Sequence, residues 1–463
     1  MLFSSVPFLF YFLPAVLICY ALAPKKFKNA VLVLFSLVFY AWGEPIYLIL
    51  MLTSIGLGYL FGILMENDAK RKRLYLSLSV FSAVLMLGIF KYADFFISGF
   101  NAATGLSLPF LRLALPVGIS FYTFQILSYT IDVYRGDAPA QRNVVSLAAY
   151  ISLFPQLIAG PIVRYTDINE QLEGRTHSFE KTSYGIRRFV IGISKKIIIA
   201  NPLGEVCFIF LESKDLSVLY VWLYAICFTL QIYYDFSGYS DMAIGLGKIL
   251  GFDFLENFNY PYISRSVTEF WRRWHMSLGT WFRDYVYIPL GGNRVKPVRH
   301  LINILAVWAL TGLWHGAQMN FVLWGLYFAA LLMLEKYLLM PLLKKWRILS
   351  HLYTLLVVVL GFVLFNAASV SQAAVQIGAM FGLGGLPLVS AESLYYLQSS
   401  AVVLAVGAIG ATQLPKKLFE KLQDSPLKTV ADFAEPVLLA AMFVLCVAYL
   451  ADGSFNPFLY FRF

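Results

Sequence analysis

The chain has 463 residues, of which 59% are hydrophobic and only 13% are charged, and its mean hydropathy is +0.70. Soluble domains contain about 45–50% apolar and about 25% charged residues, so this composition excludes a soluble globular protein. We therefore expect a multi-pass membrane protein in which one integral-membrane domain occupies residues 1–463. The net charge of +10 is explained by basic loops on one side of the membrane and requires no nucleic-acid partner.

Twelve apolar segments approach the roughly 17–25 residues that a membrane-spanning helix needs. They predict an all-α polytopic fold with about 11–12 transmembrane helices. The basic loops 24–29 and 70–73 indicate the cytoplasmic side, which places both chain ends outside the cytoplasm. The segments lie near residues 6–23, 30–42, 46–65, 74–90, 115–134, 190–212, 218–235, 301–318, 319–340, 352–370, 394–413 and 434–450.

Two segments do not fit a series of simple crossings. Residues 144–160 are apolar but short, contain Pro155 and have basic residues on both sides. A re-entrant or interfacial pair of helices is therefore expected there. Residues 236–300 are rich in Gly, Pro, Trp, Tyr and Arg, a composition typical of the headgroup region. We expect short helices at the cytoplasmic interface in this segment.

His315 is marked out by its depth in an apolar segment. With residue 301 near the membrane surface, His315 lies 14 residues deeper, about 21 Å at the helical rise of ~1.5 Å per residue. That is well inside a hydrocarbon core of roughly 30 Å. Ionisable side chains at such depth are costly and mark functional sites, and histidine acts as a general acid or base near neutral pH. The alternative is a structural histidine satisfied by a carbonyl or by Asn320.

His275 ends an aromatic and basic cluster, Phe270–His275, in the segment expected at the interface. A solvated histidine is an equally good interpretation of that position. Arg272 and Arg273 in the same cluster suit either snorkelling at the lipid headgroups or binding of phosphate groups.

Two polar residues at the end of an expected span, Asp235 and Ser237, allow two interpretations. Asp235 either orients a histidine or, with Ser237, caps the helix that follows. The histidines His177, His300 and His351 are expected in cytoplasmic loops without a functional role. No Cys, His or acidic cluster has the spacing of metal ligands, so no metal is expected.

Five sequence blocks within residues 115–340 have a distinctive order along the chain and distinctive amino-acid sequences. They are LPVGISFYTFQILSYTIDVYRG (115–136), FPQLIAGPIVRY (154–165), QIYYDFSGYSDMAIGLGKILGF (231–252), NFNYPYISRSVTEFWRRWHMSLGTWFRDYVYIPLGGNR (257–294) and LTGLWHGAQMNFVLWG (310–325). Together with the ending Pro457–Phe463, these blocks resemble the membrane-bound O-acyltransferase family. The resemblance is to its bacterial branch, whose members O-acetylate alginate or peptidoglycan or D-alanylate teichoic acid.

The resemblance implies a fold in which spanning, tilted and re-entrant helices surround a central tunnel. It implies His315 as the membrane-embedded catalytic histidine and His275 as the second active-site residue. His315 would act as general base on the acceptor hydroxyl, while His275 would orient or polarise the donor or help to stabilise the oxyanion. Further contacts to the donor or the tunnel are expected from Arg272, Arg273, Arg283, Asp235, Ser237, Trp314 and Asn320.

The reaction implied moves an acyl group, most simply acetyl, from a cytoplasmic thioester to a hydroxyl, for O-acylation of an extracytoplasmic envelope polysaccharide. The protein would lie in the bacterial cytoplasmic membrane. No cofactor is expected to be bound permanently, since acetyl-CoA or an acylated carrier protein is the donor substrate. A separate extracytoplasmic partner with a serine-hydrolase-like fold is also implied. The alternatives are D-alanyl transfer from a carrier protein to teichoic acid and, in a different class, a proton-coupled transporter.

Overall fold

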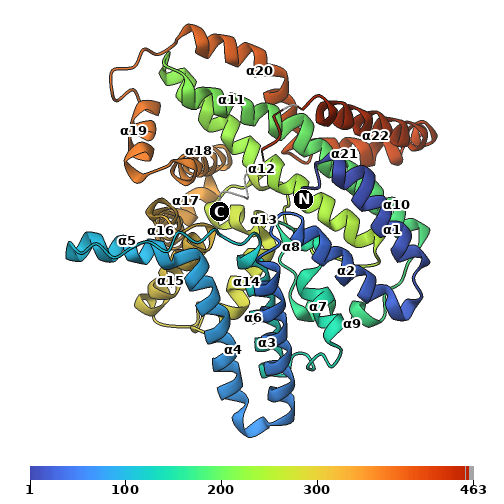
Figure 1. Ribbon diagram of the computed structural model, residues 1–463. Coiled ribbons are helices and arrows are strands. Elements are labelled where there is room, and N and C mark those ends of the chain that lie inside the picture. Colours follow the sequence, from blue (N-terminus) through green and yellow to red (C-terminus); the bar gives the residue numbers. More distant parts are fainter. Residues whose placement is uncertain (454, 458–463) are drawn as a thin grey trace. The chain divides into compact units, whose positions relative to one another are not determined.

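The computed structural model describes residues 1–453 and 455–457, and throughout this part of the chain the secondary structure is helical, without strands (Figure 1). The all-α fold expected from the composition is confirmed. Two compact units are formed, residues 1–189 with 242–255 and residues 190–241 with 256–463. The family-like ending expected at 458–463 lies outside the described residues.

The α-helices of the first unit are α1 (Leu13–Leu22), α2 (Lys28–Ala41), α3 (Leu48–Asn67), α4 (Lys72–Leu87), α5 (Ala93–Thr104), α6 (Ile119–Arg135), α7 (Val144–Ser152), α8 (Phe154–Leu157) and α9 (Tyr165–Glu173). Those of the second unit are α11 (Asn201–Glu212), α13 (Val267–Arg273), α14 (Met276–Phe282), α15 (Pro297–His315), α16 (Met319–Leu334), α17 (Met340–Lys345), α18 (Arg347–Asn366), α19 (Val370–Met380), α20 (Ala391–Gly410), α21 (Leu414–Gln423) and α22 (Lys428–Ala451). Helices α10 (Phe179–Ser194) and α12 (Val218–Ile249) contribute residues to both units. Short π-helical turns extend several of these helices, among them η5 (Lys195–Ala200), η7 (Arg283–Tyr287) and η8 (Glu335–Leu339).

Seven helical segments of the described chain are long and apolar enough to cross a bilayer. They coincide with seven of the twelve spans expected from the sequence, and the chain is a multi-pass membrane protein. The other five expected segments are largely helical too, but do not meet the length and composition of a spanning helix; α2, for example, has 14 residues and α6 has 17. The seven are 48–67, 69–104, 218–249, 319–345, 347–366, 391–410 and 428–451.

Helix α12 is longer than the sequence indicated. The expected span ended near residue 235 and was to be followed by short interfacial helices, but the helix continues to Ile249. Asp235 and Ser237 therefore lie inside it, and the expectation that they cap a following helix is wrong. The hydropathy of the sequence falls near residue 235 because α12 contains several polar side chains from there on. Those at 235, 237, 240 and 241 are buried in the fold and do not mark its end.

The short apolar segment 144–160 forms the expected pair of helices. Helix α7 has nine residues and α8 has four, with a break at Leu153, whose φ of −52° and ψ of 111° are not helical. Asn143 caps α7, since its Oδ1 accepts from the backbone N–H of Val145 at 2.9 Å. Neither helix is long enough to cross a bilayer.

The region after α12 contains short helices, as expected. A 3₁₀ turn, η6 (Pro261–Ile263), is followed by α13 and α14 of seven residues each and by the π turn η7. Aromatic side chains hold them together; Trp274, for example, stacks on Phe270 with ring centroids 5.5 Å apart. Their position at the cytoplasmic interface stays a prediction.

Helices α15 and α16 lie side by side in the second unit and approach each other very closely (Figure 1). A Cβ added at Gly312 would overlap the carbonyl of Phe321, and one at Gly325 would overlap the carbonyl of Trp308. Small residues that let two backbones meet are the usual means by which helices associate in lipid, where apolar burial gives little driving force. Gly312 and Gly325 therefore set the distance between these two helices.

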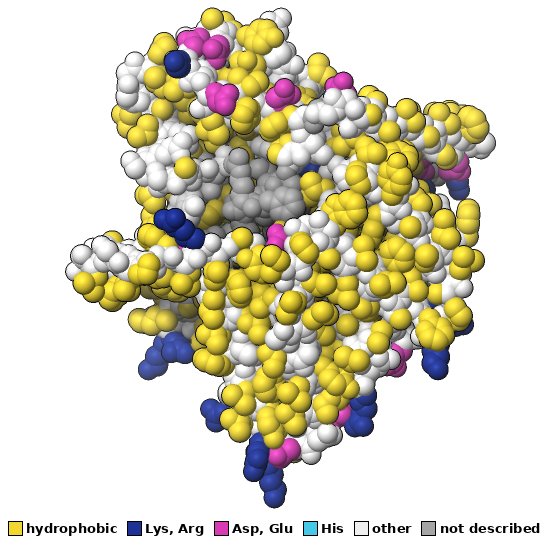
Figure 2. All heavy atoms as spheres, in the orientation of Figure 1, with side chains coloured by type: hydrophobic (Ala, Val, Ile, Leu, Met, Phe, Trp, Pro, Cys, Tyr) yellow, Lys and Arg dark blue, Asp and Glu magenta, His cyan; other side chains and the backbone are white. Residues whose placement is uncertain are grey.

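The first unit shows the surface pattern of helices that face lipid. Helices α3, α4 and α6 pack against one another, and α3 and α4 carry exposed apolar side chains such as Leu60 and Phe81. Figure 2 shows hydrophobic side chains over these helices and Lys and Arg gathered at the turn between α3 and α4. Lys70, Arg71 and Arg73 are exposed there. An apolar surface ending in a basic turn is typical of the cytoplasmic end of a membrane hairpin.

Candidate active site

His315 is the last residue of α15, and its side chain is 8% exposed. Three aromatic rings meet its imidazole nearly at right angles: Trp314 at 4.9 Å, Trp324 of α16 at 5.2 Å and Phe365 of α18 at 5.3 Å between centroids. The close approach of α15 and α16 puts Trp324 in this position. The aromatic packing holds the imidazole in one orientation in an apolar setting.

The side-chain amide of Asn320 donates to backbone carbonyls and not to His315. Its Nδ2 donates to the carbonyl of Ala367 at 2.9 Å and to that of Phe365 at 3.5 Å. These bonds tie the start of α16 to the end of α18. Asn320 therefore does not provide the hydrogen-bond partner of His315, which was one of the interpretations that the sequence allowed.

His275 is buried, so the interpretation as a solvated histidine is wrong. It joins α13 to α14, is 2% exposed, and adopts a left-handed backbone conformation with φ of 46°. Its Nδ1 lies 3.1 Å from Oδ1 of Asn257, and its ring meets Phe236 of α12 edge to face at 4.6 Å. Burial lowers the pKa of His275 well below its usual range, and the nearby His315 lowers it further. The side chain is thus neutral at neutral pH.

The two histidines share one neighbour, Trp314. Its ring centroid lies 5.8 Å from that of His275 and 4.9 Å from that of His315. The fold therefore brings together two histidines that are 40 residues apart in the sequence. Two imidazoles in an aromatic setting suit the removal of a proton from a hydroxyl, because histidine transfers protons at neutral pH.

The three candidate arginines lie in different settings. Arg273 is engaged by Glu269, with a guanidinium nitrogen 3.0 Å from the carboxylate. Arg272 is exposed, and Arg283 is exposed and pairs with the adjacent Asp284 at 2.7 Å. Binding of donor phosphates by Arg272 or Arg283 stays a prediction, whereas Arg273 has a structural partner within its own helix.

Asp235 does not orient a histidine but belongs to a buried ion pair. Its carboxylate lies 2.6 Å from Nζ of Lys196, and the two side chains are 5% and 1% exposed. Lys196 also donates to the carbonyl of Pro457 at 2.5 Å. Ser237, two residues further along α12, is buried as well. The sequence signal for this pair was a lysine within the apolar segment 190–212, which indicates a buried partner.

A second buried carboxylate, Glu335, supports the helix that leads to His275. It is completely buried and accepts hydrogen bonds from the backbone N–H of Val267, and from the N–H and hydroxyl of Thr268 at 2.9 and 2.8 Å. These are the first residues of α13, whose N–H groups have no partner within the helix. Glu335 therefore caps α13 from a distant part of the chain, which local sequence patterns do not reveal.

His300 was expected in a loop, but this prediction is wrong. It lies in the first turn of α15, is buried, and has Nε2 3.1 Å from the hydroxyl of Tyr287 and 3.2 Å from Nζ of Lys336. The helix begins four residues earlier than the predicted span at 301, which draws His300 into the fold. Because His300 is buried and bonded, its replacement would disturb the fold and cannot serve as a neutral control for the other histidines.

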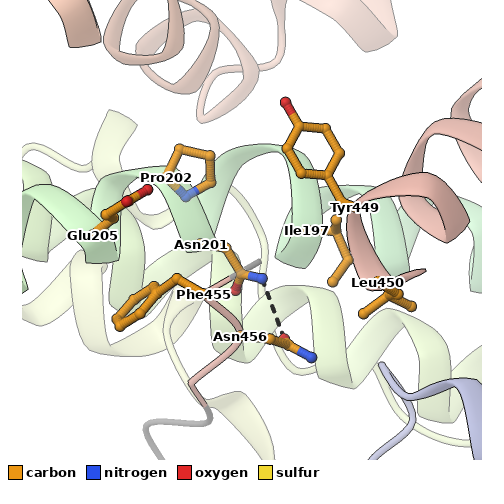
Figure 3. A pocket seen from close by; sticks show the side chains of 8 residues that line it. All are labelled: Ile197, Asn201, Pro202, Glu205, Tyr449, Leu450, Phe455 and Asn456. Atoms are coloured by element: carbon orange, nitrogen blue, oxygen red, sulfur yellow. Dashed lines mark hydrogen bonds between the residues drawn. The ribbon is translucent and has the colours of Figure 1, made fainter. Parts of the chain in front are cut away.

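A separate small pocket lies between η5, α11, α22 and the segment at 455–456 (Figure 3). Asn201 donates to Oδ1 of Asn456 at 3.2 Å on its floor. Neither histidine lines it, so we assign it no part in the reaction. In the described part of the chain, no group of three or more His, Cys, Asp or Glu side chains is placed to hold a metal ion. The pocket residues are Ile197, Asn201, Pro202, Glu205, Tyr449, Leu450, Phe455 and Asn456.

The fold is that of a multi-pass membrane protein, and its paired histidines form a buried site suited to proton transfer. Residues 138–371 match the membrane-bound O-acyltransferase family. Similarity to full-length relatives agrees, and the chain belongs to this family: it is an O-acyltransferase. A proton-coupled transporter, the alternative from the sequence, is thereby set aside.

The relatives are bacterial. A probable alginate O-acetylase of Azotobacter vinelandii is 40% identical over the whole of both chains. A peptidoglycan O-acetyltransferase of Helicobacter pylori is 34% identical and covers 84% of this chain and 81% of its own. A teichoic acid D-alanyltransferase of Bacillus subtilis is 31% identical over 54% of this chain and 68% of its own.

The buried ion pair is expected to stabilise the fold without taking part in chemistry. Lys196→Met leaves the carboxylate of Asp235 buried without its ammonium partner, which costs about 3–5 kcal/mol. The melting temperature of the protein in detergent should fall clearly, and adding Asp235→Leu to Lys196→Met should restore part of the loss.

Lys416→Ala is the matched control, because it breaks the exposed pair with Glu420, worth at most about 1 kcal/mol. It should leave the melting temperature nearly unchanged. If Asp235→Asn lost activity but melted like the wild type, the carboxylate would belong to the reaction and the structural assignment would be wrong.

Proposed function

We propose that this enzyme transfers an acetyl group from a cytoplasmic thioester, acetyl-CoA or an acylated carrier protein, to a hydroxyl for O-acetylation of an extracytoplasmic polysaccharide. Among the acceptor polysaccharides, we favour an alginate-like polymer. The protein would lie in the bacterial cytoplasmic membrane, and the donor would be a substrate, with no permanently bound cofactor.

The observation that carries this proposal is that two buried histidines both contact Trp314, in a family member whose similarity to alginate O-acetylases covers the whole of both chains. The similarity to the D-alanyltransferase of Bacillus subtilis covers only 54% of the chain. The wider coverage supports acetyl transfer over D-alanyl transfer.

In the proposed step, the acceptor hydroxyl approaches His315. The hydroxyl oxygen attacks the thioester carbonyl while the hydroxyl proton passes to His315. The thiolate of the donor then leaves and takes up a proton. His275 orients the reacting groups or contributes to stabilising the oxyanion. The aromatic rings around His315 exclude water, which disfavours hydrolysis of the thioester.

His315→Ala is expected to abolish acetyl transfer, because a general base of this kind contributes typically about 10²–10⁴-fold to the rate. His275→Ala should be severely impaired too. The measurement is transfer of radiolabelled acetyl from the donor in proteoliposomes, together with the melting temperature of each variant.

His351→Ala is the control histidine, since the side chain is only partly buried and bonds to the carbonyl of Ser264 through Nδ1. It should keep nearly full activity. Activity of His315→Ala within tenfold of the wild type would remove His315 from the catalytic role.

The basic residues on both sides of 144–160 support a topology in which α7 and α8 do not cross the membrane. Single cysteines at positions 137 and 175 should then react with a membrane-impermeant maleimide only after permeabilisation. Cysteines at 104 and at 388, an exposed position in the segment before α20, should react in intact cells. Labelling of 137 or 175 from outside would contradict this topology.

A separate extracytoplasmic protein is expected to receive the acetyl group and to modify the polymer. The segment between α19 and α20 supports such docking, because Phe381, Leu383 and Leu388 are strongly exposed. The purified chain with acetyl-CoA should hydrolyse the donor slowly and leave the polysaccharide unmodified. Addition of a membrane-anchored hydrolase-like protein should restore transfer.

Leu383→Asp with Leu388→Asp should weaken this restored transfer but leave donor hydrolysis unchanged. Leu418→Asp, at an equally exposed position on α21, is the control and should affect neither. Efficient acetylation of the polysaccharide by the single purified chain would show that no partner is needed.

A further inference from the structure

The side chain of Asn257 lies at the centre of the polar contacts around His275. Its Oδ1 is 3.1 Å from Nδ1 of His275, 3.2 Å from the backbone nitrogen of Ser277 and 2.9 Å from the hydroxyl of Ser277. Its Nδ2 donates to the hydroxyl of Ser240 at 3.1 Å. Asn257 is itself 1% exposed. The carboxamide is therefore locked between α12 and the start of α14.

The orientation of this carboxamide is fixed by chemistry. A backbone N–H only donates, so the atom facing the nitrogen of Ser277 must be the oxygen of Asn257. The same oxygen faces Nδ1 of His275, and a carbonyl oxygen only accepts. Nδ1 of His275 is consequently the nitrogen that carries the proton.

In a neutral imidazole only one nitrogen is protonated, so the other is basic and accepts hydrogen bonds. Because His275 is buried in an apolar setting, the neutral form prevails. Nε2 is therefore the basic nitrogen of His275.

Asn257 also holds the unusual backbone at His275. A left-handed conformation with φ of 46° is unfavourable for a residue with a Cβ, and such residues persist only where their surroundings impose them. The backbone N–H of Met276 donates to the carbonyl of Asn257 at 2.9 Å, and that of Ser277 to its side chain. The two residues that follow His275 are thus both bonded to Asn257.

We propose that Asn257 is a positioning residue that holds His275 in the Nδ1–H tautomer, so that His275 presents a hydrogen-bond acceptor, Nε2, to the reacting groups. The proposal rests on the proposed function in placing His275 at the reaction. It decides between the two roles open to this histidine. His275 is a hydrogen-bond acceptor that orients the reacting molecules through a donor other than the attacking hydroxyl, whose proton passes to His315, and it does not donate to the thioester carbonyl or to the oxyanion.

The test reads the tautomer directly, without relying on activity. Full-length protein is labelled with ¹⁵N,¹³C-histidine, reconstituted in proteoliposomes and studied by solid-state NMR at pH 7.5. The signals of His275 are assigned by their disappearance in His275→Gln. A protonated Nδ1 with an unprotonated Nε2 is the expected result. A protonated Nε2, or a doubly protonated ring, would overturn the proposal whatever the activity of any variant.

Asn257→Ala removes the acceptor of the Nδ1 proton. The His275 signals should then change to a mixture of tautomers, and kcat should fall by about 100-fold while KM for the donor stays within about twofold. Asn257→Asp keeps an acceptor oxygen and should restore part of kcat. Its carboxylate should also raise the pKa of His275 and move the acidic limb of the pH–rate profile upward. Among the residues that the structure describes, the titratable neighbour that faces His275 is His315 of α15, whereas Phe236 of α12 and Trp314 of α15 are uncharged.

Asn303→Ala is the matched control: Asn303 is equally buried in the same unit, but donates to the carbonyls of Leu290 and Gly292. Its replacement should leave the tautomer of His275 unchanged. Full activity of His275→Gln would contradict the proposed function while leaving the measured tautomer intact. An unchanged His275 spectrum in a folded Asn257→Ala protein would show that Asn257 does not set the tautomer.

Discussion

The close contact between α15 and α16 is the constraint on which the surroundings of His315 depend. The absence of a side chain at Gly312 and Gly325 lets the two backbones meet, and this contact brings Trp324 against the imidazole. In lipid, where apolar burial contributes little, such shape complementarity between helices supplies much of the association energy. The orientation of a candidate catalytic histidine is thus set by residues that carry no functional group.

Three deep polar groups of the second unit are bonded to parts of the chain that are distant in the sequence. Lys196 meets Asp235, Glu335 meets the first turn of α13, and Asn257 meets His275. A polar group without water or a partner costs several kcal/mol, so these contacts are strongly directional. Together with the aromatic packing of Phe270 and Trp274, they specify how short helices such as α13 and α14 are held.

Most of the helices could be predicted from the sequence because hydropathy is a local property, and His315 stood out as an ionisable residue in an apolar segment, whereas His275 was singled out only by the resemblance to the family. The partners of those residues could not, since they join positions far apart in the chain: 18 residues for His275 and Asn257, 39 for Lys196 and Asp235. The end of α12 was predicted wrongly for a related reason. A hydropathy window treats Asp235 as facing lipid or water, whereas its carboxylate is paired inside the protein. Glu335 had a detectable signal, a carboxylate in an apolar helix, but its partner on α13 had none.

The cap that Glu335 provides has a consequence for biosynthesis. The N–H groups of Val267 and Thr268 are bonded by a carboxylate that follows them by 68 and 67 residues. A helix of seven residues is not stable by itself, because nucleation costs more than so few hydrogen bonds return. While the chain is being translated, α13 therefore stays incomplete until residue 335 has left the ribosome and α16 has entered the membrane. The backbone at His275 is among the last parts of this unit to reach its final form, so a nascent chain that stalls before Glu335 contains both histidines but not their geometry.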